Sequence, residues 1–222
     1  MNPSNTAVRT VSGVPVSRVV RNAFILLAMV LAVAAGGAFA GFAVGLPLGL
    51  GLWIGFMVVF IGGPFALNAI KDGQMAIWMT FLWAGLVGFL LSPLVAAYAA
   101  MPGGQGIVFN ALAATAAIFF ALAGYAVASR RDFSFMGGFL FAGLIVVLLA
   151  IVANLFLQMP ALSLAISGAA VLLMSGLILY DTSRLIHDGQ ANPTMIVVSL
   201  FSSITVLFVH LLNLFSLLSG DD

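Results

Sequence analysis

The chain contains 222 residues, of which 64% are hydrophobic and only 6% carry a charge. Soluble domains have about 25% charged residues, so this composition excludes a water-soluble globule and indicates that lipid is the main solvent. The net charge of +1 excludes nucleic acid as a partner, because phosphate binding needs clustered Lys and Arg. Cys is absent, which excludes disulfides, thiolate catalysis and Cys-ligated metals. We therefore expect an integral membrane protein without a cofactor.

The first 21 residues form a polar tail that includes Arg9, Arg18 and Arg21. The apolar run from Asn22 to Gly45 is longer than the ~7–15-residue core of a signal peptide, so we predict a retained first helix. Short breaks containing Pro, Gly or charged residues divide the rest of the chain into segments long enough to cross a bilayer. The sequence thus predicts an all-α membrane protein, a bundle of seven transmembrane helices at residues 22–45, 48–69, 75–99, 107–128, 135–158, 161–187 and 194–218.

All seven Lys and Arg residues fall on one side of this topology. They lie in the N-terminal tail, the second loop, the fourth loop and the end of the sixth span: Arg9, Arg18, Arg21, Lys71, Arg130, Arg131 and Arg184. Cytoplasmic loops collect basic residues, so we predict a cytoplasmic tail (residues 1–21), a transmembrane domain (22–218) and a periplasmic tail (219–222). A last segment that re-enters without crossing the membrane is the alternative for the seventh span.

Small and polar residues in the spans indicate close helix packing. Gly37, Gly41, Gly45 and Gly49 recur every fourth residue, and small residues let helix backbones approach closely in lipid. We expect this stripe to pack inside the bundle, with a homodimer face as the alternative. Hydrogen bonding between helices is the expected role of the amides Asn68, Asn110, Asn154, Gln158 and Asn213.

Asp181 is the foremost candidate for a functional side chain, because it follows the apolar run from Leu172 to Tyr180. A helix that ends near His187 places Asp181 about 9 Å inside the span, where a carboxylate is costly and by default functional. The competing interpretation is an ion pair with Arg184, which lies three residues further along the same helix face. We expect His187 to cap the end of this helix.

His210 lies in the otherwise apolar second half of the seventh span. An imidazole hydrogen-bonded inside the bundle is the first interpretation and proton sensing the second. Ser167-Gly168 together with His210 imitates the Ser and His of a serine intramembrane protease. The residue two before that serine is Ala165, and no convincing oxyanion site is evident in the sequence. We therefore predict that the protein is not an enzyme.

Three segments resemble signatures of the Bax inhibitor-1 family. Residues 125–138 (YAVASRRDFSFMGG) are similar to the junction of that family's fourth and fifth helices, 85–94 (GLVGFLLSPL) to its third helix, and 180–189 (YDTSRLIHDG) to the end of its sixth. The resemblance covers nearly the whole chain from Arg21. It implies seven transmembrane helices and, in some bacterial members, a pH-sensitive calcium leak controlled by one Asp on each of the last two helices.

Asp181 matches the first of these two acids. The second belongs to a family pattern Ser-Leu-Tyr-Leu-Asp, which residues 199–203 (SLFSS) match without a gap, so Ser203 occupies the position of the acid. A register over residues 207–215 places His210 there instead. Ser203 is the better match, because its depth of about 14 Å in its helix is closer to that of Asp181. The carboxylate pair is thus incomplete, and Asp181, Arg184, Ser203 and His210 are the candidate pH-sensing and gating residues.

The resemblance is greatest to bacterial inner-membrane members that modulate the membrane protease FtsH, through residues 152–158 (VANLFLQ) and 160–167 (PALSLAIS). It implies a multi-pass protein of the bacterial inner membrane that binds the FtsH complex, including HflK and HflC, and modulates its degradation of membrane proteins. A homo-oligomer is compatible with this interpretation. The alternative function is a pH-sensitive Ca²⁺ leak. The polar tail, with Arg9 and Arg18, is the expected handle for the protease, because it reaches ~70 Å when extended.

Overall fold

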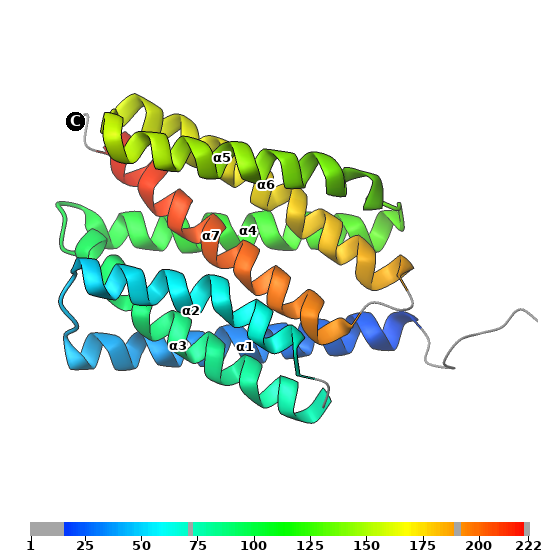
Figure 1. Cartoon of the computed structure of the whole chain (residues 1–222). Helices are drawn as coiled ribbons and strands as arrows, with labels where there is room; N and C mark the ends of the chain where they lie inside the picture. Colours follow the sequence, from blue (N-terminus) through cyan, green and yellow to red (C-terminus); the bar gives the residue numbers. More distant parts are fainter. Residues whose placement is uncertain (1–15, 71–72, 189–191, 220–222) are drawn as a thin grey trace, which may run out of the picture.

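The computed structural model describes residues 16–70, 73–188 and 192–219. This part of the chain contains seven long α-helices and no strand (Figure 1). The helices are α1 (Val16–Val44), α2 (Leu50–Asn68), α3 (Gly73–Ala99), α4 (Gly104–Ser129), α5 (Gly137–Leu157), α6 (Pro160–His187) and α7 (Pro193–Ser219), with a 3₁₀ turn η1 (Ser134–Met136) before α5. Each α-helix is long and apolar enough to cross a membrane. The predicted spans are confirmed, although α1 begins earlier than expected.

Proline and left-handed backbone conformations define several helix ends. Pro160 and Pro193 begin α6 and α7, where the missing N–H of proline removes no helix hydrogen bond. Arg130 and Gln158 follow α4 and α5 with φ values of 49° and 50°, a left-handed conformation that stops a helix and turns the chain. The short connections that result place consecutive helices antiparallel.

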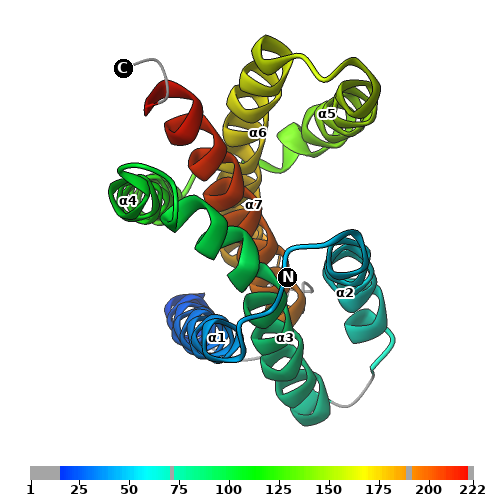
Figure 2. The same cartoon turned by 90° about the vertical axis from the view of Figure 1, so that its left-hand side faces the viewer.

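The last helix, α7, lies at the centre of the bundle (Figure 2). It contacts α1, α2, α3, α4 and α6, and it buries a larger share of its residues than the other spans. α1 packs mainly on α3, α2 on α3, and α5 on α6. The largest fully buried side chains include Leu27, Ile178, Phe201, Leu207 and Leu212. The core is therefore built mainly around α7.

Glycines allow α1 and α3 to approach each other closely. A Cβ atom at Gly37 would collide with the carbonyl oxygen of Gly85, and a Cβ atom at Gly41 would collide with α3 one turn further along. Gly45 and Gly49 have open space around them, because α1 has already ended. The prediction that the glycine stripe packs inside the bundle is therefore confirmed for its first two members and wrong for its last two.

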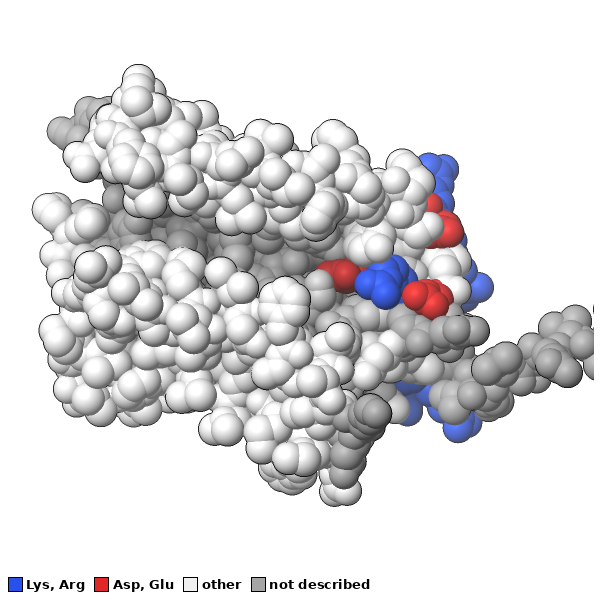
Figure 3. Space-filling model, viewed as in Figure 1, with Lys and Arg blue, Asp and Glu red and all other residues white. Residues whose placement is uncertain are grey.

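Charged side chains of the described residues gather toward one end of the bundle (Figure 3). We call this the charged end; it is the end at which α1 begins and α4 and α6 finish, and it carries Arg18, Arg21, Arg130, Arg131 and Arg184. Among the described residues, the opposite end carries no charged side chain. Arg9, Lys71 and the acidic C-terminal tail lie outside the described ranges.

Candidate functional site

The candidate residues Asp181, Ser203 and His210 lie along the interface between α6 and α7. Asp181 is only 2% exposed. Because α6 ends at His187, Asp181 lies six residues, or about 9 Å, from the charged end of its helix. The predicted depth and burial of this carboxyl group are therefore confirmed.

Ser199 of α7 is the hydrogen-bond partner of Asp181. Its Oγ donates to Oδ2 of Asp181 over 2.5 Å, the short distance typical of a hydroxyl bound to a carboxylate. Ser199 lies six residues after Pro193, where α7 begins, so its depth equals that of Asp181. Ser203, one turn deeper, is also buried. The sequence analysis passed over Ser199, although matching the depth of Asp181 across the two helices would have selected it.

Arg184 pairs with the residue that follows α6 rather than with Asp181. Its Nη2 atom lies 3.6 Å from Oδ2 of Asp188, and its guanidinium carbon lies 5.6 Å from the centre of the Tyr180 ring. The suggested Asp181–Arg184 ion pair is thus wrong as a direct contact. The physical reason is desolvation, because Asp188 is exposed, whereas a bond to Asp181 would draw the guanidinium into the apolar interior.

Ser183 and His187 attach the end of α6 to the connection between α4 and α5. Oγ of Ser183 accepts a hydrogen bond from the N–H of Phe133 (2.9 Å). His187 Nε2 lies 2.9 Å from the carbonyl oxygen of Arg130, and its Nδ1 lies 3.0 Å from that of Ser183. His187 therefore caps its helix as predicted and also contacts a distant segment. Two of the three segments that resemble the family signatures thus meet in space.

The connection between α4 and α5 is further ordered by Asp132. Its Oδ1 accepts a hydrogen bond from the N–H of Ser134 (2.9 Å) at the start of η1. Backbone and side-chain hydrogen bonds from Ser134 hold the pKa of the exposed Asp132 carboxyl below its usual range, and the nearby His187 acts in the same direction. The charged carboxylate therefore helps to shape this turn.

A second polar cluster lies on α6 and α7, further from the charged end. His210 Nδ1 is 3.2 Å from Oγ of Ser167, and Asn213 donates from Nδ2 to Ser167 (3.0 Å) and Ser163 (3.1 Å). These contacts confirm that His210 is hydrogen-bonded inside the bundle and that Asn213 links two helices. The cluster borders a cavity of about 480 Å³ whose walls also include α2, α3 and α5.

The geometry around Ser167 differs from that of a protease site. Ser167 is fully buried two turns inside α6, where backbone N–H groups are used by the helix and cannot bind an oxyanion. Its contact with His210 is therefore a packing interaction between helices.

The amides at the end of α5 differ from expectation. Oδ1 of Asn154 accepts a hydrogen bond from the N–H of Met159, beyond its own helix, and Gln158 ends that helix.

The described residues contain no group of three or more His, Cys, Asp or Glu that could hold a metal ion. What the α6–α7 interface provides is one buried carboxyl group, several hydroxyls and one imidazole. Thr182, next to Asp181, is fully buried, and its hydroxyl has no hydrogen-bond partner among the described residues. Such buried unpaired groups are rare and call for an explanation.

Seven apolar helices, five of which contact the central last one, and a carboxyl group buried between the last two define a polytopic membrane protein with a polar site inside its bundle. The chain belongs to the Bax inhibitor-1 family, because the family model described as "Inhibitor of apoptosis-promoting Bax1" matches residues 16–220. It is 39% identical to "Modulator of FtsH protease YccA" of Escherichia coli over 92% of each chain. An uncharacterized protein of Pseudomonas aeruginosa is 39% identical over 93% of this chain and 92% of its own length.

Proposed function

We propose that this protein is a non-enzymatic protein of the bacterial inner membrane that binds the FtsH protease complex and modulates its degradation of membrane proteins. The observation that supports this most strongly is the 39% identity to the FtsH modulator YccA over 92% of each chain. The likeness therefore extends along the bundle and is not confined to one segment. A second YccA relative is named as an inner membrane protein. HflK and HflC, the membrane regulators associated with FtsH, are the further partners that we propose.

The proposed orientation places the charged end at the cytoplasmic face. Five described arginines lie at this end, and basic residues are retained on the cytoplasmic side of a membrane. Residues before Val16 would then be on the cytosolic side, where an ATP-driven protease engages its substrates. Arg18 belongs to the first turns of α1, so the proposed handle is limited to the residues before the helix, including Arg9.

Affinity capture tests this function directly. The tagged protein is expressed in cells that contain proteolytically inactive FtsH, and the solubilised complex is purified and analysed for FtsH, HflK and HflC. An unrelated seven-helix membrane protein with the same tag is the control. We expect enrichment of FtsH only with this chain. Equal recovery of FtsH with both proteins would contradict the proposal.

Removal of the tail tests how the protease engages the protein. Deleting residues 2–15 leaves α1 intact and retains Arg18 and Arg21, which hold the first helix in its orientation. We expect pulse-chase measurements to show slower FtsH-dependent decay of the truncated chain. Decay as fast as that of the full chain would place the handle elsewhere, without affecting the capture result.

A cation leak is the second candidate function, and the burial of Asp181 beside the unpaired hydroxyl of Thr182 favours it. Ca²⁺ takes ~6–8 oxygen ligands, so the few oxygens near Asp181 suit weak passage better than tight binding. The test is Ca²⁺ flux into proteoliposomes. Asp181→Asn should abolish a leak, whereas Asp132→Asn, at the exposed surface of the same end, should leave it unchanged. A flux equal to that of protein-free vesicles would exclude this function.

A further inference from the structure

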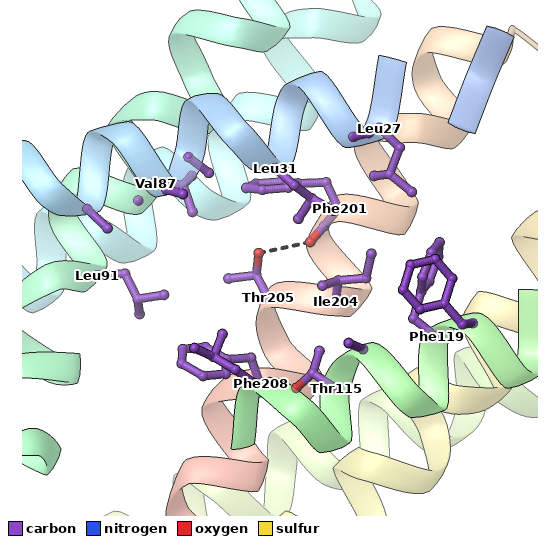
Figure 4. A pocket seen from close by; sticks show the side chains of 18 of the residues that line it. Leu27, Leu31, Val87, Leu91, Thr115, Phe119, Phe201, Ile204, Thr205 and Phe208 are labelled. Atoms are coloured by element: carbon purple, nitrogen blue, oxygen red, sulfur yellow. Dashed lines mark hydrogen bonds between the residues drawn. The ribbon is translucent and has the colours of Figure 1, made fainter. Parts of the chain in front are cut away.

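An apolar groove lies between α1 and α4 (Figure 4). Residues of α3 and α7 form its inner wall, and its volume is about 890 Å³. The backbones of α1 and α4 do not pack against each other in the described part of the chain. Their walls meet where the rings of Phe24 and Phe119 contact edge to face, with centres 6.1 Å apart. The groove is therefore a gap between two helices that share no extensive interface.

The chemistry of the lining suits hydrocarbon. Two hydroxyl groups lie in the groove, those of Thr115 and Thr205. Each donates to a carbonyl oxygen of its own helix, at Ala111 (2.7 Å) and Phe201 (2.8 Å). Because these donors are already satisfied, they offer little to a polar ligand. The remaining lining residues are aliphatic or aromatic side chains and glycines.

The length of the groove matches the thickness of a membrane. On α1 its lining extends from Phe24 to Phe42, a distance of about 27 Å at 1.5 Å per residue. The hydrocarbon layer of a bilayer is ~30 Å thick. The groove therefore lies within the region that acyl chains occupy, and it is long enough to hold them along their length.

Positive charge flanks the groove at one end. Phe24 on α1 and Val127 on α4 line the groove at this end. Arg21 lies three residues before Phe24, and Arg130 lies three residues after Val127. Arg18 lies three residues before Arg21, Arg131 directly follows Arg130, and all four side chains are exposed. The carbonyl oxygen of Arg130 is held by the His187 contact, which fixes the base of that side chain. Among the described residues, the opposite end of the groove has no charged side chain.

We propose that this groove binds the acyl chains of an anionic phospholipid, whose phosphate is held by the arginines at the charged end. Arginine binds phosphate through paired N–H donors, and basic sites between transmembrane helices bind anionic headgroups. The apolar groove supplies the place for the chains, and the arginines supply selectivity for the charged headgroup. The lipid would belong to the leaflet at the charged end and would bridge α1 and α4.

Native mass spectrometry of the full chain tests this proposal. The protein is released from detergent with added phosphatidylglycerol or phosphatidylcholine of identical acyl chains. We expect phosphatidylglycerol to be retained more strongly, by about fivefold for each arginine that contacts the phosphate. Arg21→Gln and Arg130→Gln should lower retention of phosphatidylglycerol toward that of phosphatidylcholine. Arg184→Gln, at the same end but on α6, is the matched control and should not.

A second pair of variants tests the groove itself. Ala116→Phe places a ring in the groove, whereas Ala117→Phe places the same ring on an exposed position of α4 that does not line it. We expect only the first to lower the retention of both lipids. Equal retention of both lipids by the wild-type chain would overturn the proposal. The proposal would also be overturned if the protein forms a dimer that Ala116→Phe dissociates without a change in lipid retention. The groove would then hold a helix of a second copy.

Discussion

Ser199 and Asp181 join α6 and α7 by a hydrogen bond that lies six residues inside each helix. Asp181 is 2% exposed, and loss of its donor would leave a buried acceptor without that partner. The cost of such a loss is about 1–3 kcal/mol, although hydrogen bonds inside membrane proteins average only ~0.6 kcal/mol. The effect of removing the Ser199 hydroxyl on the free energy of unfolding therefore measures how much this hydrogen bond contributes to stability.

We predict that Ser199→Ala lowers the free energy of unfolding by about 1–2 kcal/mol. Ser202→Ala is the matched control, because Oγ of Ser202 bonds to the carbonyl oxygen of Val198 in its own helix. Thermal unfolding in detergent micelles measures both effects. In a double-mutant cycle with Asp181→Ala, which removes the acceptor, additive effects of the two substitutions would show that the bond contributes nothing to stability.

The contacts of His187 depend on which of its two ring nitrogens carries the N–H. Both of its nitrogens face carbonyl oxygens, those of Ser183 and Arg130, and carbonyl oxygens only accept hydrogen bonds. A neutral imidazole carries one N–H and satisfies one of them. With its N–H on Nε2 the neutral ring donates to Arg130 of the α4–α5 connection, and Nδ1 then faces Oγ of Ser183, 3.4 Å away, as an acceptor.

We predict that Asp132→Ala destabilises the protein at neutral pH and has little effect in strong acid. The pKa of Asp132 is lowered in the folded protein, so its charged form adds stability above its usual pKa of ~3.9. This contribution is lost as the pH falls through the lowered folded-state value. Midpoints of thermal unfolding at pH 7 and below pH ~3 would measure it. Asp132→Asn keeps an acceptor for Ser134 and should have a smaller effect.

The contact between α1 and α3 depends on the absence of a single side-chain carbon. A Cβ atom at Gly37 meets the backbone carbonyl of Gly85, and a backbone cannot move aside as a flexible side chain can. Gly36, its neighbour, has no atom within 4 Å of the corresponding position. These adjacent glycines therefore separate the effect of close packing from the effect of glycine on helix stability.

We predict that Gly37→Ala destabilises the protein by about 1–3 kcal/mol, the usual cost of overpacking. Gly36→Ala should be neutral or stabilising by up to ~1 kcal/mol, because alanine favours helix. Unfolding measurements in micelles of the same detergent compare the two variants. Equal stability of the two would mean that α1 and α3 separate readily and that their contact adds little.

The position of the arginines predicts how the whole bundle is oriented in the membrane. All described arginines lie at the charged end, and the positive-inside rule assigns this end to the cytoplasm. An odd number of spans then brings the C-terminus to the periplasm. We predict that a C-terminal alkaline phosphatase fusion is active and a C-terminal fluorescent protein is dark. A reporter inserted at residues 70–73 should show the reverse. A cytoplasmic C-terminus would show that α7 does not cross.

The limits of the seven helices were predictable because proline, glycine and charged residues interrupt apolar runs of the right length. Which helices pack against each other could not be predicted from the sequence. In a soluble protein an apolar stripe marks the buried face of a helix, but in lipid both faces are apolar: on α1, Leu27 is 1% exposed and Ile25 is 51% exposed. The groove between α1 and α4 and the contact of His187 with Arg130 therefore required the structure.

The depth of Asp181 was predictable from the end of its helix, whereas its partner was not. The candidate at the family position, Ser203, lies on the same helix as the observed partner, Ser199, one turn away. A single turn changes depth by about 5.4 Å. That difference exceeds the reach of a serine side chain, so the residue that bonds to Asp181 is Ser199, and the role of Ser203 in pH sensing stays a prediction.

The central position of α7 also determines which contacts between helices can form only late during synthesis. Ribosomes add ~5–20 residues per second from the N-terminus, so α7, with 27 residues, emerges a few seconds after α6. Until then, α6 presents Asp181 without Ser199, and the five helices that contact α7 lack their common neighbour. Chains that terminate early would thus leave an open bundle with an unpaired carboxyl group in the membrane.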